Sequence, residues 1–132
     1  MRTKFLSIAA AAGLLLSAGA GTALAHHSFA AEFDNQRPVS LEGEVVMMEW
    51  VNPHSWLHID VTKEDGSVER WMVEGGAPSA LLRRGWTRDT LPPGTEVRVQ
   101  GFQAKDGSLR ANARDIEFPD GARLDLGGTE QP

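Results

Sequence analysis

Two Asp-Gly pairs, Asp65-Gly66 and Asp106-Gly107, constrain the fold of this chain more than any other feature. An Asp-Gly pair between segments of alternating polarity is typical of a tight β-hairpin, because glycine readily adopts the positive φ that such turns need. The flanking segments are 55–62 and 68–74 for the first pair, and 95–103 and 109–118 for the second. The sequence therefore predicts two hairpins in a mainly β fold.

The strand predicted at 55–62 alternates most clearly. Its aliphatic side chains share one face, which we expect to be directed into the core: Leu57, Ile59 and Val61. The other face is aromatic and polar, and we expect it to be directed outward or into a groove: Trp56, His58 and Asp60. The preceding segment 52–55 contains Pro53, which cannot donate to a strand ladder, so it predicts a turn or corner.

A further strand is predicted at 39–51, where Gly43 indicates a bulge or a bend. Residues 77–85 predict a short helix, with Pro78 in its first turn and Gly85 at its end. In the strand at 109–118 the alternation slips between Ala113 and Ile116, which indicates a bulge, and 122–126 could close the sheet. Three strands, a helix and two or three strands predict a small OB-like barrel of five to six strands. A six-stranded open sandwich is the competing architecture.

The first 25 residues have the pattern of a secretory signal: Arg2 and Lys4, a short apolar run, and an A-x-A site at Ala23–Ala25. The mature chain would begin at His26 and contain 107 of the 132 residues. We expect an N-terminal arm at 26–38, an OB-like domain at 39–126 and a flexible tail at 127–132. After cleavage no membrane span is expected, and the protein should be periplasmic or secreted.

The net charge of the chain disfavours some classes of binding partner. Loss of Arg2 and Lys4 changes the 13 basic and 18 acidic side chains of the whole chain to 11 and 18, a formal net charge of −7. Such an acidic protein is a poor candidate for binding nucleic acid or an anionic membrane surface. The chain has no cysteine, so it forms no disulfides. It also lacks a G-x-S-x-G or H-E-x-x-H motif, and we predict no catalytic residues.

Three sequence blocks carry a resemblance to a known family: HHSFAAEFD at 26–34, EWVNPHSWLHIDV at 49–61 and LLRRGWTR at 81–88. With the strand around Trp71, they resemble a family of small exported proteins of Gram-negative bacteria that is catalogued as a domain of unknown function. The resemblance covers nearly all of the mature chain. It implies a small secreted β-barrel and transfers no catalytic role.

Cleavage before His26 would create a chemically distinctive terminus. An N-terminal histidine offers its α-amine and ring Nδ1 to one ion, and a second imidazole completes a set that suits the tetragonal nitrogen ligation of Cu(II). The candidates for that imidazole are His27, His54 and His58. We therefore expect an exported non-enzymatic protein that binds copper through His26, with His27 or His54. Met47 and Met48 add thioethers suited to Cu(I), although they point to opposite faces of their strand.

His54 and His58 would be about 13 Å apart on an extended strand, too far to share an ion unless the corner brings them closer. Alternatively, His54 caps the turn through its ring. The competing function is a binding module for a small organic ligand, glycan or partner protein, with Trp50, Trp56, His58 and Arg70 as binding residues. A third possibility is an accessory subunit of a periplasmic redox enzyme.

Overall fold

A computed structural model describes residues 29–128 of the chain. The predicted signal peptide, the candidate ligands His26 and His27, and residues 129–132 lie outside the described residues. The chain falls into two compact units, Met1–Ala31 and Glu32–Pro132, and the second contains all the strands found within residues 29–128. No helix within residues 29–128 is long and apolar enough to cross a membrane.

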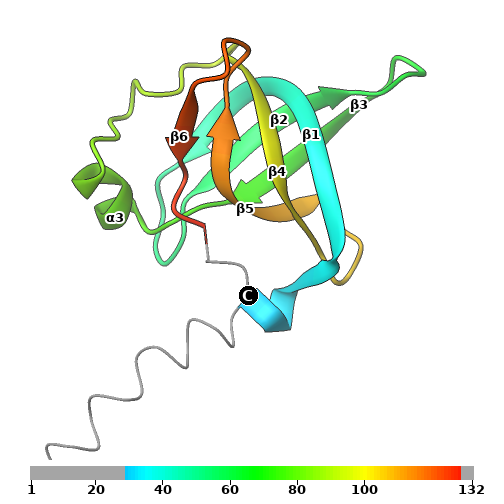
Figure 1. The fold of residues 1–132 in the computed structure, drawn as a ribbon, viewed down its shortest axis with the longest axis horizontal. Helices are drawn as coiled ribbons and strands as arrows, with labels where there is room; N and C mark the ends of the chain where they lie inside the picture. The colour runs from blue at the N-terminus through cyan, green and yellow to red at the C-terminus, as the bar shows by residue number, and fades with distance from the viewer. Residues whose placement is uncertain (1–28, 129–132) are drawn as a thin grey trace, which may run out of the picture. The chain divides into compact units, whose positions relative to one another are not determined.

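Six strands form one ring-like sheet, accompanied by a short helix (Figure 1). In chain order they are β1 (Phe33–Glu49), β2 (Trp56–Thr62), β3 (Val68–Glu74), α3 (Pro78–Arg83), β4 (Glu96–Ala104), β5 (Arg110–Glu117) and β6 (Arg123–Asp125). Neighbouring strands pair antiparallel in the order β3-β2-β1-β4-β5-β6, and a parallel pairing of β3 with β5 closes the ring. This confirms the mainly β fold, with the helix between the third and fourth strands.

Both predicted Asp-Gly turns form. Gly66 and Gly107 have positive φ angles of 84° and 77°. In each turn the aspartate side chain accepts a hydrogen bond from the backbone N–H two residues later, over 2.9 Å at Ser67 and 2.9 Å at Ser108. The hydroxyl groups of Ser67 and Ser108 donate to the same two carboxylates. The hydroxyl bonds first, and the backbone bonds after them, lower the pKa values of Asp65 and Asp106.

Strand β1 is longer than predicted, because it begins at Phe33 rather than at residue 39 and runs through Pro38. Its first part pairs with β4, and the pairing is irregular between Phe33 and Pro38, which accommodates a residue without an N–H. Its last part turns to pair with β2. The irregularity in that pairing falls between Val45 and Met47, so the bulge predicted at Gly43 is displaced by a few residues.

Gly43 nevertheless allows a close approach of two strands. A Cβ at this position would lie 2.6 Å from the backbone oxygen of Asp60 on β2, which is closer than real Cβ atoms come. On β5, the bulge predicted between Ala113 and Ile116 is confirmed: those residues pair with Gly101 and Val99, so one residue of β4 faces two of β5.

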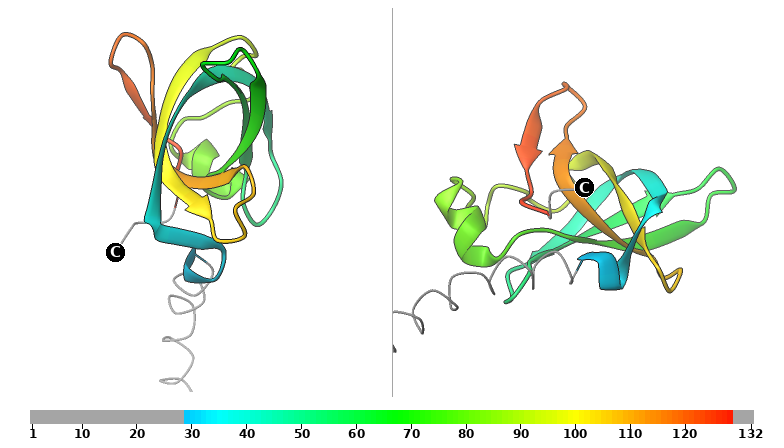
Figure 2. Two further views of the ribbon diagram at one scale, coloured as in Figure 1. Left: turned by 90° about the vertical axis from the view of Figure 1, so that its right-hand side faces the viewer. Right: turned by 60° about the horizontal axis from the view of Figure 1, so that its bottom comes forward.

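The core lies inside the ring and follows the predicted alternation, with Leu57 and Ile59 fully buried on β2. The left view of Figure 2 looks along the ring, with α3 at the far end. Leu81 of α3 and Trp86 after it are buried in the core, and the indole N–H of Trp86 donates to the backbone oxygen of Asp125 over 2.9 Å. The core comprises Leu41, Val45, Leu57, Ile59, Trp71, Val73, Leu81, Trp86, Leu91, Val97, Val99, Ala111, Ala113, Ile116 and Leu126.

Candidate functional site

The corner at 52–55 is held to the segment that follows β3. Ser55 donates its N–H to the Gly76 carbonyl and accepts from the N–H of Gly75, each over 2.9 Å. These bonds continue the β2–β3 ladder beyond the ends of both strands. The Asn52–Pro53 peptide bond in the same corner is cis. The Ser55 bonds bring His54, which precedes Ser55, beside the end of β3.

The ring of His54 contacts two acceptors there. Its Nδ1 lies 3.2 Å from the carbonyl oxygen of Gly75 and 3.2 Å from Oε1 of Glu74. Because the Gly75 carbonyl can only accept, the neutral ring donates to it from Nδ1, which leaves Nε2 as the nitrogen with a free lone pair. The His54 side chain is 37% exposed, whereas that of Glu74 is 7% exposed. His54 therefore joins a buried carboxyl group to the surface.

Among the carboxyl groups of the described residues with a resolved pKa shift, Glu74 is the one whose pKa is raised. Burial raises its pKa, nearby His54 and Arg110 lower it, and Glu32 raises it further. Its parallel partner on β5, Asn112, is 1% exposed, and the side-chain oxygen of Asn112 finds no hydrogen-bond partner among residues 29–128. We call Glu74, His54, Glu32, Arg110 and Asn112 the Glu74 cluster. Buried polar groups with perturbed pKa values are typical of functional sites.

A second set of side chains lies on the outer face of β2. The Nε2 of His58 is 3.0 Å from Oε2 of Glu49 on β1, and the His58 side chain is 14% exposed. Trp56 shares this face, is half-buried, and pairs with Glu49 on one side and Glu74 on the other. The predicted alternation is thus correct for Trp56 and His58.

Two other predicted ligand-binding residues already have partners. Arg70 donates two hydrogen bonds to the carboxylate of Asp60, over 2.8 and 2.9 Å. Trp50 packs against the core, and the Arg88 guanidinium lies 5.9 Å from its ring centroid. An anionic ligand would have to displace Asp60 to reach Arg70.

The structure thus brings His54 to Glu74 and places Trp56 with His58, while His26 and His27 lie outside the described residues. Sequence reasoning missed Glu74 and Asn112. The alternation of β3 could have placed Glu74 on the outer face, but its burial depends on pairing with β5, for which the local sequence holds no signal.

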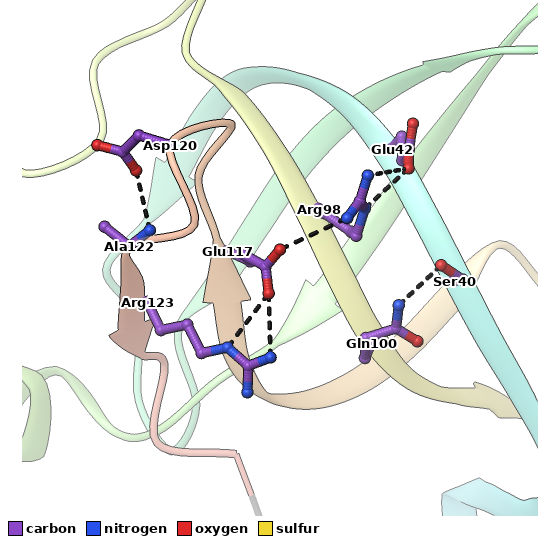
Figure 3. A network of polar contacts seen from close by, with 8 residues as sticks. All are labelled: Ser40, Glu42, Arg98, Gln100, Glu117, Asp120, Ala122 and Arg123. Carbon is purple, nitrogen blue, oxygen red and sulfur yellow. Dashed lines mark hydrogen bonds and ion pairs between the residues drawn. The ribbon is translucent and has the colours of Figure 1, made fainter.

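Two grooves, of about 490 and 570 Å³, are lined mainly by β1, β4 and β5, the first also by Asp60 and Thr62 of β2 and the second by Arg123 of β6. Both are lined by Arg98 and Glu117, which take part in the ion-pair network in Figure 3. Arg98 contacts Glu42 at 2.7 Å and Glu117 at 3.4 Å, and Arg123 contacts Glu117 at 3.1 Å. These partly exposed pairs are of the surface type that contributes little energy, so we base the candidate site on the buried polar groups.

Comparison with known proteins agrees with the sequence blocks. The model of a family of unknown function (DUF6152) matches residues 12–113. The chain belongs to this family. A search of curated proteins and a search of solved structures return no match. The matched region contains β1, β2, β3, α3 and β4 and therefore includes His54, His58 and Glu74.

Proposed function

We propose that this member of the family is an exported, non-enzymatic copper-binding protein of the Gram-negative periplasm. In this proposal, signal cleavage makes His26 the first residue, and its α-amine and ring Nδ1 chelate Cu(II). His54 supplies the second imidazole, and His27 is the alternative. Among residues 29–128, no three His, Cys, Asp or Glu side chains gather to hold a metal ion, so the proposal depends on His26 as well.

The observation that carries the proposal is the orientation of the His54 ring. Histidines that bind metals usually donate the other ring N–H to a carboxylate or carbonyl, which fixes the tautomer and strengthens the ligand. Here Nδ1 lies 3.2 Å from the Gly75 carbonyl oxygen, which can only accept, so Nδ1 carries the proton and Nε2 is the nitrogen left for an ion. Oε1 of Glu74 also lies 3.2 Å from Nδ1. Partial exposure of the ring allows an ion to approach from solvent.

A Cu(II) titration tests the proposal. We would compare correctly processed protein with a variant that has one extra residue before His26, and with His54→Gln. Both changes should weaken binding by more than the roughly 10–100-fold typical of losing an outer-shell partner. His58→Gln is the matched control and should leave Cu(II) affinity unchanged. Equal affinity with and without the extra residue would refute the role of the terminal amine.

Processing is tested separately. Intact mass of protein recovered from a periplasmic fraction should correspond to a chain that begins at His26. A different mature terminus would remove the chelate and with it the proposal.

The outer face of β2 favours a second candidate, a binding module for a small organic ligand, glycan or partner protein. Trp56 is half-buried there, and Met47 is 45% exposed on the adjacent strand, so an apolar platform is accessible. A ligand panel followed by tryptophan fluorescence addresses this candidate. A Trp56→Ala variant with unchanged ligand responses would exclude it.

A further inference from the structure

Two methionines flank His58 on the outer face of the sheet. On β1, Met47 is the direct cross-strand partner of His58, and on β3, Met72 is its direct partner on the other side. Directly paired residues on neighbouring strands project from the same face. The register therefore forms a row of thioether, imidazole and thioether across three adjacent strands.

This row is close enough to converge. Cβ atoms of directly paired antiparallel residues are about 4.5–5.5 Å apart, and a methionine has three rotatable bonds beyond its Cα. Two sulfur atoms can therefore turn toward a nitrogen that lies between them without any movement of the backbone. Thioether and imidazole ligands together select soft metal ions, of which Cu(I) is the typical example.

The ring of His58 is prepared for such a role. Its Nε2 lies 3.0 Å from the carboxylate of Glu49, so a proton at Nε2 leaves the Nδ1 lone pair for an ion. The His58 side chain is 14% exposed, so most of it is packed against its neighbours and a small part reaches solvent. Glu49 thus accepts a hydrogen bond from His58 in the same way that carboxylates outside a metal's ligand shell accept one from a metal-binding histidine.

Core packing does not explain the position of Met47. Met47 is 45% exposed, whereas the next residue, Met48, pairs with buried Leu57 and packs against the core. Burial of a large apolar side chain normally stabilises a protein, so Met47, with 45% of its surface exposed, gains less from packing than it would in the core.

Neighbouring charges also suit a cation. Asp60 is neutralised by Arg70, and Arg110, the partner of Met72 on β5, contacts Asp106 at 3.3 Å. Glu49 adds a negative charge next to His58. Trp56, two residues before His58 on the same face, offers an aromatic ring, and a cation near such a ring is stabilised by its quadrupole.

We propose that Met47, His58 and Met72 form a binding site for Cu(I), with Glu49 as the residue that positions the imidazole. The site shares no residue with His26, His27 or His54, so it does not rest on the proposed Cu(II) function.

Competition with a chromogenic Cu(I) chelator under anaerobic conditions tests this site. We expect one Cu(I) per chain, and a Met47→Leu/Met72→Leu double variant should lose more than the roughly 10–100-fold typical of removing an outer-shell partner. Met48→Leu is the matched control, because it keeps its volume in the core and should bind Cu(I) as the wild type does. A double variant with wild-type Cu(I) affinity would overturn the proposal.

Methyl NMR supplies a readout that folding defects do not imitate. During titration with Ag(I), a redox-inert substitute for Cu(I), the ε-methyl signals of Met47 and Met72 should move together while that of Met48 stays fixed. Movement of Met48 alone would place the ion elsewhere and refute the site. Both experiments are repeated with the variant that has one extra residue before His26. Unchanged Cu(I) affinity and unchanged methyl shifts in that variant would show that this site is separate from the proposed Cu(II) site.

Discussion

Two consecutive leucines of α3 provide a strict test of how the ring is closed at one end. Leu81 is 0% exposed and belongs to the core, whereas Leu82 is 57% exposed. Leu81→Ala should therefore remove buried methyl groups and leave a cavity, while Leu82→Ala removes side-chain atoms that are mostly in water. The two variants differ in burial and hardly at all in chemistry.

The magnitude follows from burial. A fully buried Leu→Ala change costs about 2–5 kcal/mol, and we expect about 3 kcal/mol at Leu81. For a domain of roughly 100 residues, each kcal/mol lowers Tm by about 4–8 °C, which corresponds to a decrease of about 12–24 °C. Leu82→Ala should stay within about 0.5 kcal/mol of the wild type, because alanine is the better helix former and little contact is lost.

Urea unfolding followed by tryptophan fluorescence and by far-UV circular dichroism measures both variants. Coincident transitions and an unchanged m-value would show that the variants differ in stability alone. If Leu81→Ala cost no more than Leu82→Ala, α3 would not close the core and the reasoning would be wrong.

Three further variants test the cluster and the close contacts of the sheet. Burial raises the pKa of Glu74, so its contribution to the free energy of unfolding is greatest below the ordinary glutamate pKa and falls as pH rises through the raised value. Metal-free Glu74→Gln should therefore gain stability over the wild type with rising pH, and a pH-independent difference in urea midpoints would contradict this. Gly43→Ala introduces a Cβ 2.6 Å from the oxygen of Asp60 and should cost about 1–3 kcal/mol in thermal unfolding; no loss would show that β1 can shift. Trp86→Phe removes the 2.9 Å bond to the Asp125 carbonyl and should cost about 1–3 kcal/mol, whereas wild-type stability would mean that water replaces the indole.

The features that the sequence predicted correctly are those with local causes. The Asp-Gly turns depend on a few adjacent residues, and the helix depends on Pro78 at its start and Gly85 at its end, where φ is 90°. The bulge between Ala113 and Ile116 also appears in the sequence, because an extra residue shifts the alternation.

The features that were missed depend on distant residues. The start of β1 at Phe33 depends on β4, whose Ala104 pairs with it. The sequence instead predicted an arm at 26–38 and a strand from residue 39, because the pairing partner lies about 70 residues away. His54 contacts a carbonyl 21 residues away, and Glu74 is buried by a strand that is not its neighbour in sequence. Alternation assigns a residue to a face, but it does not say which other strand covers that face.

The two described histidines, His54 in the corner before β2 and His58 on β2, contact carboxylates from different neighbouring strands. His54 contacts Glu74 at the end of β3, and His58 contacts Glu49 at the end of β1, while β2 lies between these strands. Each ring is therefore held by its own carboxylate, and turning either toward the other would break that contact. For the copper binding proposed above, this arrangement favours two separate centres over one shared ion. It also matches the chemistry of the donors, because nitrogen ligands suit Cu(II) and thioethers suit Cu(I). Substitutions at the two centres should then act additively on metal affinity, as expected for sites without shared partners.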